Sequence, residues 1–305
     1  MRNAFVQTLV DLAAEDKNIF LMTADLGYNA VTGFMEAYPD RFINTGICEQ
    51  NMSSMAAGMA LEGKTVFTYS IANFPTLRCI EQIRNDIAYH HANAKIVSVG
   101  AGFSYGALGM SHHATEDIAI MRAIPEISVL SPCDKFEAAA LTEYAARLNG
   151  PCYIRLDKGG SPELHDKPPL LEEGKPLMLR SGDNIAIFAT GAITAEAVGA
   201  ADKLKETNHL SCAVYSFPFI KPLDKDFIYS AAQKYSYIFT LEEHSILGGL
   251  GGAVAEIIAE CRSNTVLKRF GLIDRFADTV GSQNYLRRYY EIDQVGIIQQ
   301  IIKLI

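Results

Sequence analysis

Short runs rich in β-branched and aromatic residues alternate with longer helical stretches, and this alternation restricts the fold more than any other sequence feature. The runs predicted as strands are Ile19–Thr23, Thr65–Tyr69, Lys95–Val99, Ser128–Leu130, Cys152–Leu156, Ile185–Ala189, Cys212–Tyr215, Tyr237–Thr240 and Leu267–Leu272. The predicted helical stretches include Asn51–Leu61, Thr76–His90, Lys135–Arg147, Thr194–Glu206 and Gly251–Glu260. Strands that alternate with helices form βαβ units, so we predict an α/β fold with doubly wound, mainly parallel sheets.

One segment interrupts this alternation. Between residues 159 and 176 the chain concentrates glycine, proline and charged residues, which is the composition of a linker. We therefore predict two α/β domains, over residues 1–160 and 181–305, joined by a linker over residues 161–180. A chain of 305 residues is long enough to build both.

Composition narrows the possible functions. Apolar residues make up 49% and charged residues 20%, which predicts a large core. The 27 basic residues are outnumbered by 35 acidic ones, giving a net charge of −8 without a basic run, so nucleic-acid binding and attraction to anionic membranes are disfavoured. We find no apolar stretch near the roughly 20 residues of a membrane span, and the acidic N-terminal segment does not resemble a secretory signal.

The cysteines give no support for a metal site. Six of them are scattered without a CxxC pair, at positions 48, 79, 133, 152, 212 and 261. We therefore predict no metal ligand on this chain. Most lie in apolar surroundings, as free core cysteines do in a reducing compartment, and we predict a cytoplasmic protein.

The sharpest local motif surrounds Glu49. A glycine-containing turn over residues 44–48 precedes a helix rich in Ser, Ala and Gly, and Glu49 lies at or just before its first turn. Acids are common at helix starts for electrostatic reasons alone. The small residues, however, would let another backbone approach closely, as at a subunit interface. A carboxylate at the edge of such an apolar interface could share a proton with a ring nitrogen.

Residues 46–67 (GICEQNMSSMAAGMALEGKTVF) resemble the pyrimidine-binding domain of transketolases and of deoxyxylulose phosphate synthase. The similarity continues in order through residues 74–90, 95–134 and 152–160. Residues 242–260 resemble the C-terminal domain of the same family. The resemblance covers nearly the whole chain. It implies a thiamine-diphosphate-binding (pyrimidine) domain followed by a transketolase C-terminal-like domain.

The resemblance also implies cofactor contacts. In this family a glutamate hydrogen-bonds N1′ of the aminopyrimidine and favours the imino tautomer, which removes the thiazolium C2 proton to give the ylid. The matching residue is Glu49, whose carboxyl group can exchange a proton with a weakly basic nitrogen in a dry site. Phe74 matches the main aromatic stacking position, and Ile71 stands where a second aromatic is common. Asp25, after the first predicted strand, and Ile47 are further implied cofactor contacts.

For the substrate, the family's Thr-His-Gln motif corresponds to Ser-His-His here, which makes His112 the second catalytic candidate, with His113 beside it. Arg155 matches a family arginine that grips the anionic end of the substrate, a task suited to its forked donors. A strand-end salt bridge is the alternative role for Arg155. Arg78 is a weaker candidate for an anion contact, and Asn29 is another candidate for substrate binding.

Two positions depart from the family pattern. Leu108 replaces an acid that contacts sugar hydroxyls, and Gly100 stands where many transketolases carry a histidine near the reaction centre. Both remain candidates for lining the substrate pocket. Such a pocket should be roomier and less polar, so we expect a substrate other than an ordinary pentose phosphate.

The resemblance finally implies a partner. The family binds diphosphate and Mg²⁺ through a Gly-Asp-Gly motif and a later Asn in a separate N-terminal domain. We find no equivalent here, because residues 181–184 (SGDN) lack the second glycine. The implied partner is an N-terminal transketolase subunit that carries the diphosphate and Mg²⁺ site, in an α2β2 assembly.

The leading hypothesis is therefore transfer of a two-carbon ketol unit from a ketose donor to an aldehyde acceptor, with sugars or sugar phosphates as substrates and only in the assembled enzyme. One alternative is the β subunit of a 2-oxoacid dehydrogenase or of an acyloin-forming enzyme. Another is a non-catalytic regulatory subunit, against which the presence of Glu49, Phe74 and His112 argues. The turn before Glu49 and the Ser-His-His loop favour transketolase.

Overall fold

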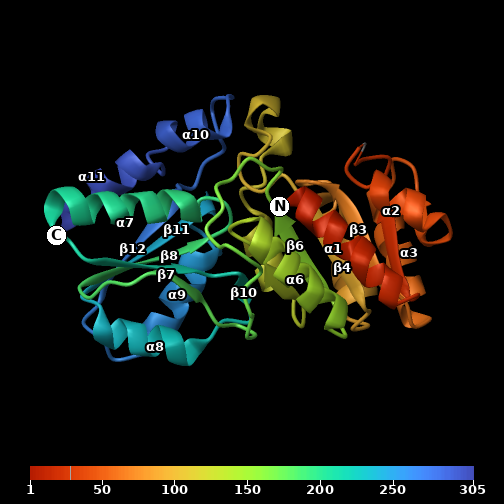
Figure 1. The fold of residues 1–305 in the computed structure, drawn as a ribbon, viewed down its shortest axis with the longest axis horizontal. Helices are drawn as coiled ribbons and strands as arrows, with labels where there is room; N and C mark the ends of the chain where they lie inside the picture. The colour runs from red at the N-terminus through yellow and green to blue at the C-terminus, as the bar shows by residue number, and fades with distance from the viewer. Residues whose placement is uncertain (28) are drawn as a thin grey trace.

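The computed structural model describes residues 1–27 and 29–305, which form two α/β domains side by side (Figure 1). The helices longer than one turn are α1 (Arg2–Glu15), α2 (Thr32–Ala37), α3 (Glu49–Leu61), α5 (Asp117–Ala123), α6 (Lys135–Arg147), α7 (Thr194–Asn208), α8 (Lys225–Lys234), α9 (Leu250–Ala259), α10 (Gln283–Tyr289) and α11 (Gln294–Leu304). The strands are β1 (Ile19–Thr23), β2 (Phe42–Asn44), β3 (Thr65–Ile71), β4 (Ala94–Val99), β5 (Ser128–Leu130), β6 (Cys152–Leu156), β7 (Leu177–Arg180), β8 (Ile185–Thr190), β9 (Cys212–Ser216), β10 (Phe219–Lys221), β11 (Tyr237–Ser245) and β12 (Val266–Leu272).

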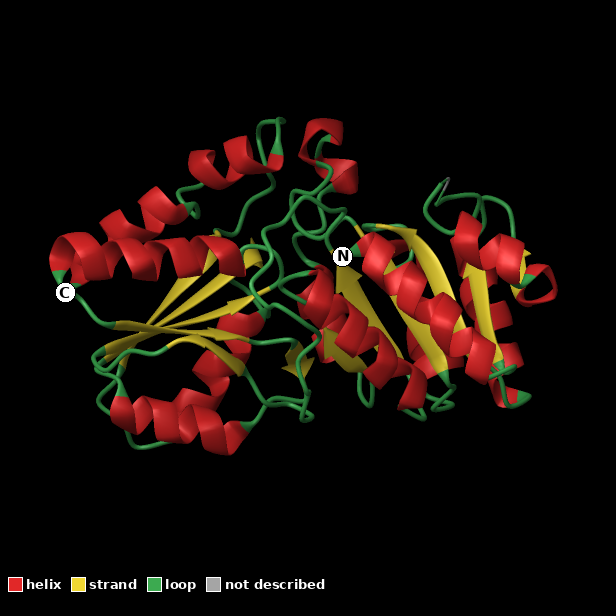
Figure 2. Cartoon of the chain, in the orientation of Figure 1, coloured by secondary structure: helices red, strands yellow, loops and turns green. Residues whose placement is uncertain are grey.

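The first domain is built on a sheet of seven described strands in the order β10-β5-β6-β4-β3-β1-β2. All neighbours pair in parallel except β10 with β5. Every residue of β4 and β6 is buried, as expected for central strands that helices cover on both faces. The helices α1 and α6 pack together on one face of this sheet, and α3 packs against β3 (Figure 2).

The second domain has five described strands in the order β12-β11-β8-β9-β7. Here β7 is an antiparallel edge strand, and the other pairs are parallel. Helices α7 and α11 lie against each other on one side of the sheet, whereas α8 and α9 lie on the other (Figure 1). The expectation of mainly parallel α/β sheets is confirmed in both domains.

Strand β10 links the two domains. It comes after β9 of the second domain, yet it adds to the first sheet, with Phe219 opposite Leu130 and Lys221 opposite Val129. The Lys221 ammonium also donates to the carbonyl oxygens of Arg122 and Ile124. A strand within the second domain's part of the sequence therefore belongs to the sheet of the first domain, which the predicted boundaries did not anticipate.

The predicted helix over Thr76–His90 is not regular. It divides into a 3-10 turn η2 (Leu77–Cys79), a single α turn α4 (Ile80–Gln82) and a π-helical segment η3 (Ile83–Ala88). Two further 3-10 turns, η4 (Gly106–Leu108) and η5 (Met110–His112), lie between the domains, where η4 contacts α10 (Figure 1). No helix in the described ranges is both long and apolar enough to cross a bilayer.

Buried charges hold the domains together. The Glu243 carboxylate accepts a hydrogen bond from the Phe103 N–H (2.6 Å) and pairs with Arg287. The neighbouring Glu242 caps α9 by accepting hydrogen bonds from the N–H groups of Leu250 and Gly251, both at 2.8 Å. The Phe103–Glu243 hydrogen bond crosses between the domains, while the contacts of Arg287 and of α9 hold the two carboxylates in place within the second domain.

Candidate active site

The candidate residues of the first domain gather where its parallel strands end. Asp25 follows β1, Glu49 follows β2, Phe74 follows β3 and Gly100 follows β4. Because these strands run in parallel, their carboxyl ends meet at one edge of the sheet. Ligands of open α/β sheets bind at that edge.

Glu49 lies at the first position of α3, as predicted, and is only 1% exposed. Its Oε2 accepts a hydrogen bond from Nη1 of Arg78 at 2.7 Å. The Arg78 side chain is 45% exposed, so one end of this ion pair is dry and the other reaches solvent. The guanidinium and the N-terminus of α3 together stabilise a negative charge on Glu49. Arg78, a candidate for an anion contact in the sequence, therefore pairs with Glu49 in this structure, and its contact with a substrate anion stays a prediction.

Aromatic rings extend this pair into a row. The guanidinium carbon of Arg78 lies 4.7 Å from the ring centroid of Phe74, and the ring of His112 meets Phe74 edge-on with centroids 5.3 Å apart. Nδ1 of His112 lies 3.0 Å from the Ser111 hydroxyl. The fold therefore brings Glu49 at the start of α3, Phe74 after β3 and His112 in η5 together. Ile71, at the end of β3, is half-buried.

Gly100 does not leave the open space that the sequence suggested. A Cβ at this position would lie 2.5 Å from the ring of Tyr105, and its φ of +115° is strained for any other residue. Tyr105 thus fills the volume beside Gly100, and the expectation of a roomier pocket at this point is wrong. Burial raises the pKa of Tyr105. The Lys158 ammonium lies 5.1 Å from the centroid of the same ring.

Tyr105 and Lys158 are site neighbours that the sequence reasoning missed. Both fall inside segments that carry the family resemblance, and this position in the sequence could have marked them as candidates for the site. Leu108 lies in η4 and is 58% exposed, which leaves an apolar side chain at this rim of the site.

His113 is held inside its loop. It is 3% exposed, its Nε2 lies 3.0 Å from the Gly106 carbonyl oxygen, and its ring packs edge-on against Phe103. Its Nδ1 has no hydrogen-bond partner among the described residues. These contacts give His113 a part in shaping the loop, and its contact with substrate stays a prediction.

Arg155 is buried in a network within the chain. Its Nε donates to Oδ2 of Asp117 at 2.8 Å, and its Nη2 donates to the carbonyl oxygens of Ala114 (2.7 Å) and Glu243 (3.0 Å). Burial acts to lower the pKa of Arg155, but its neighbours Asp117, Tyr153 and Glu243 together outweigh burial, so the pKa is raised. Arg155 is only 2% exposed, so the geometry favours the strand-end salt bridge over contact with the anionic end of a substrate.

Asp25 and Asn29 share a cavity of about 200 Å³ with Thr23 and Asn44. The Asn44 amide donates to Oδ1 of Asp25 (3.2 Å), and the Asp25 N–H donates back to Oδ1 of Asn44 (2.9 Å). These two hydrogen bonds fix the turn after β1 against the turn that leads to Glu49. Ile47, in that second turn, is 79% exposed, which is unusual for so large an apolar side chain.

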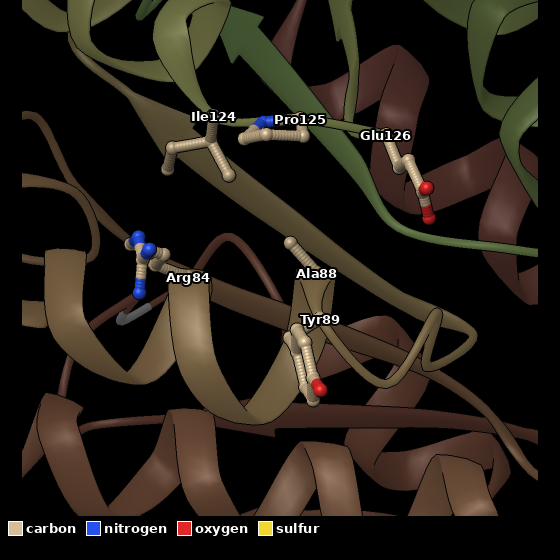
Figure 3. Close-up of a pocket in the computed structure, with 6 residues that line it drawn as sticks. All are labelled: Arg84, Ala88, Tyr89, Ile124, Pro125 and Glu126. Atoms are coloured by element: carbon tan, nitrogen blue, oxygen red, sulfur yellow. The ribbon is translucent and has the colours of Figure 1, made fainter.

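A separate pocket of about 200 Å³ lies at η3, and Figure 3 shows the residues that line it: Arg84, Ala88, Tyr89, Ile124, Pro125 and Glu126. The lining contains none of the predicted site residues. We therefore assign the chemistry to the strand-end cluster around Glu49.

Comparisons with known proteins give the family. The description "Transketolase, pyrimidine binding domain" matches residues 1–162, and "Transketolase, C-terminal domain" matches residues 174–297. The chain belongs to the transketolase family. It is 38% identical to a putative transketolase C-terminal section of Methanocaldococcus jannaschii, over 99% of this chain and 95% of that protein.

Another relative is named as one subunit of a transketolase. The chain is 34% identical to this subunit of the apulose-4-phosphate transketolase of Actinobacillus succinogenes, over 100% of this chain and 98% of that protein. A solved split-gene transketolase, described as an inactive tetramer of four beta subunits, superposes with a TM-score of 0.91 at 35% identity. The match covers 99% of this chain and 97% of that one. The protein is thus the β-type subunit of a thiamine-diphosphate-dependent, transketolase-type transferase.

Proposed function

We propose that this transketolase subunit transfers a two-carbon ketol unit from a ketose to an aldehyde, and does so only when an N-terminal subunit completes its site. One observation carries the proposal. A buried carboxylate, Glu49, lies at a helix start beside a half-buried aromatic ring and a histidine, at the carboxyl edge of a parallel sheet. This set matches what the pyrimidine end of thiamine diphosphate requires.

The residues fit that cofactor. The Glu49 carboxylate is already removed from water, so a hydrogen bond to a ring nitrogen would need little further desolvation. Phe74 presents a ring next to it that could stack on a pyrimidine, and Asp25 and Ile47 lie on neighbouring turns. When bound, thiamine diphosphate supplies the carbon nucleophile of the reaction. Glu49 would hold or move the proton at the pyrimidine nitrogen.

The diphosphate and Mg²⁺ would be held by the partner subunit. Two features of this chain support an assembly. Ile47 is 79% exposed beside the buried Glu49, and α3 leaves Asn51, Ser54, Met55 and Gly58 exposed along one side. Small residues on an uncovered face suit close packing against another subunit. We propose an α2β2 enzyme in the cytoplasm.

For the substrate we propose a sugar or sugar phosphate other than an ordinary pentose phosphate. Leu108 and Gly100 stand where the family commonly carries an acid and a histidine, and the Tyr105 ring that fills the space beside Gly100 lies 6.3 Å from the His112 ring, centroid to centroid. The name of the Actinobacillus succinogenes relative includes a sugar phosphate, which supports a phosphorylated substrate. His112 is the candidate to bind donor hydroxyls.

Reconstitution tests the proposal. The chain alone should be folded but inactive and should not bind thiamine diphosphate stoichiometrically. The pair with an N-terminal transketolase subunit, Mg²⁺ and cofactor should transfer a ketol unit between a panel of ketoses and aldehydes. Transfer to a lipoyl acceptor protein instead would favour the 2-oxoacid dehydrogenase alternative. An assembled pair without turnover on any donor would contradict an enzymatic role.

A further inference from the structure

A second cluster of reactive side chains lies at the start of α6, outside the row around Glu49. Cys133, Glu137 and His165 bring a sulfur, a carboxylate oxygen and a ring nitrogen within 4.8 Å of one another. Cys133 and Glu137 are fully buried, and the His165 side chain is 14% exposed. His165 belongs to the linker, so the cluster joins the linker to the first domain.

The ring of His165 is oriented by a carboxylate. Its Nδ1 lies 3.2 Å from Oδ2 of Asp134, while its Nε2 lies 3.8 Å from Oε1 of Glu137. A histidine that donates Nδ1–H to a carboxylate presents a lone pair on Nε2, and metal-binding histidines are commonly held in this way.

Asp134 is itself firmly fixed. It is the N-cap of α6, where Oδ1 accepts hydrogen bonds from the N–H groups of Phe136 and Glu137, both at 2.9 Å. Its Oδ2 accepts from the N–H groups of Leu164 and His165 as well as facing the ring. The linker backbone and the ring of His165 are therefore anchored together on one carboxylate.

Glu137 has one oxygen to spare. Its Oε2 accepts a hydrogen bond from the Cys133 N–H at 2.7 Å, but its Oε1 makes no hydrogen bond of ordinary geometry within the described part of the chain. The buried Ser216 hydroxyl, at the end of β9, adjoins both Cys133 and Glu137 and is equally without a bond of ordinary geometry there. A buried carboxylate oxygen without a hydrogen bond of ordinary geometry is costly, and a ligand between Oε1 and the His165 ring would satisfy it.

We propose that Cys133, Glu137 and His165 bind a divalent transition-metal ion, with Zn²⁺ as the best match. One sulfur, one nitrogen and one oxygen form a donor set that zinc prefers. Nε2 and Oε1 lie 3.8 Å apart and would need to approach to about 3.3 Å to share one tetrahedral zinc ion. The Cys133 thiolate and the Glu137 carboxylate would balance the two charges of the ion.

Binding would release the Cys133 thiol proton to solvent, because the S–H bond is replaced by a metal–sulfur bond. The helix N-terminus beside Cys133 favours the thiolate that results. The partly exposed ring of His165 offers a route for the ion. The bound metal would pin the linker to α6, which is a structural role separate from ketol transfer.

Co²⁺ is a suitable probe because its absorption reports the ligands. The untagged full-length chain, stripped with a chelator, should bind one Co²⁺ with the strong visible bands of a tetrahedral site and a thiolate-to-cobalt charge-transfer band, both displaced by Zn²⁺. Cys133→Ser should lose the charge-transfer band, and His165→Gln should lose stoichiometric binding. Asp134→Asn keeps an N-cap residue and should weaken binding about 10- to 100-fold. Cys212→Ser, at a buried cysteine elsewhere, should leave the spectrum unchanged.

Two results would overturn the metal site: no stoichiometric Co²⁺ or Zn²⁺ binding by the folded chain, or an unchanged spectrum in both Cys133→Ser and His165→Gln. The cluster would then be a histidine–glutamate ion pair. Should Cys133→Ser misfold, His165→Gln still decides the question, since its ring reaches the surface. Zn²⁺ should raise the Tm of the wild-type chain and not that of His165→Gln.

Discussion

Arg78 donates a hydrogen bond from Nη1 to Oε2 of Glu49 across 2.7 Å, and so joins a half-exposed cation to a fully buried carboxylate. The two ends of this pair differ in freedom. Glu49 is fixed by the first turn of α3, whereas the long side chain of Arg78 can move into solvent. A ligand arriving at Glu49 would therefore meet a carboxylate that is already dry and already ordered.

Replacing Glu49 tests its proposed role in proton transfer. Glu49→Gln keeps the shape of the side chain but cannot exchange a proton, so the reconstituted enzyme should lose about 100-fold or more in kcat. Circular dichroism and the Tm of the isolated chain should show a folded protein. Glu62→Gln, at the exposed end of the same helix, serves as the matched control and should keep full activity. Near-normal turnover by folded Glu49→Gln would rule out the assignment.

The ion pair itself can be measured by a double-mutant cycle. Arg78→Met leaves the buried Glu49 carboxylate without its partner and should destabilise the chain by about 1–2 kcal/mol, less than for a fully buried pair because Arg78 is half-exposed. In the Glu49→Gln background the same substitution should cost much less. Urea denaturation of the four proteins gives the coupling energy, and a value near zero would mean that the contact contributes nothing to stability.

Gly100→Ala tests whether Tyr105 really fills the space beside the backbone. The added Cβ would overlap the Tyr105 ring and would adopt a strained φ, so we expect a loss of about 2–4 kcal/mol in the free energy of unfolding. Adding Tyr105→Ala should recover part of this loss by removing the overlap. Gly33→Ala, in α2 with no atoms within 4 Å of the new Cβ, should be neutral or stabilising. Equal effects at both glycines would contradict the packing described here.

Lys95 should make stability depend on pH. It is fully buried in β4, its ammonium donates to the carbonyl oxygens of Leu148 and Gly150, and burial lowers its pKa from 10.5 to about 8. Between pH 8 and 10.5 the unfolded chain binds a proton that the folded chain has lost, so stability rises with pH, by at most about 1.4 kcal/mol per unit.

The comparison with Lys95→Met isolates this effect. The buried Cys152, whose pKa burial raises to about 12, acts in the opposite direction above pH 9 and is coupled to Lys95. The two proteins are therefore compared from pH 8 to 9, where the difference in unfolding free energy between wild type and Lys95→Met should move in favour of wild type. A constant difference over this range would show that Lys95 keeps its ordinary pKa.

Periodicity alone predicted most of the central elements. Strands β1, β5 and β6 and helix α6 have the predicted bounds, because buried parallel strands read as continuous apolar runs and the intervening helices are amphipathic. Short edge strands such as β2 and β10 were missed, since three residues carry too little pattern. The π-helical segment Ile83–Ala88 was read as ordinary helix, because side-chain periodicity does not distinguish hydrogen-bond spacing.

The site was predictable where the motif was contiguous. The position of Glu49 at the start of α3 followed from the turn before it. Its partner Arg78 and the filling of the space beside Gly100 by Tyr105 depend on how separate loops meet, and no spacing along the chain encodes that. The cluster of Cys133 and His165 escaped notice for the same reason, because its ligands come from a helix start and a distant linker.

Strand β10 limits how this molecule can be taken apart. Since it returns from the second domain to extend the first sheet, a cut in the linker would leave two fragments still bound through backbone hydrogen bonds. Expressed separately, the first fragment would expose β5 as a bare edge prone to aggregation. Exchanging the C-terminal domain between homologues at the linker would likewise place a foreign β10 beside β5. The three residues of β10 would then have to pair with the β5 of another protein, which limits the exchanges that the fold can accept.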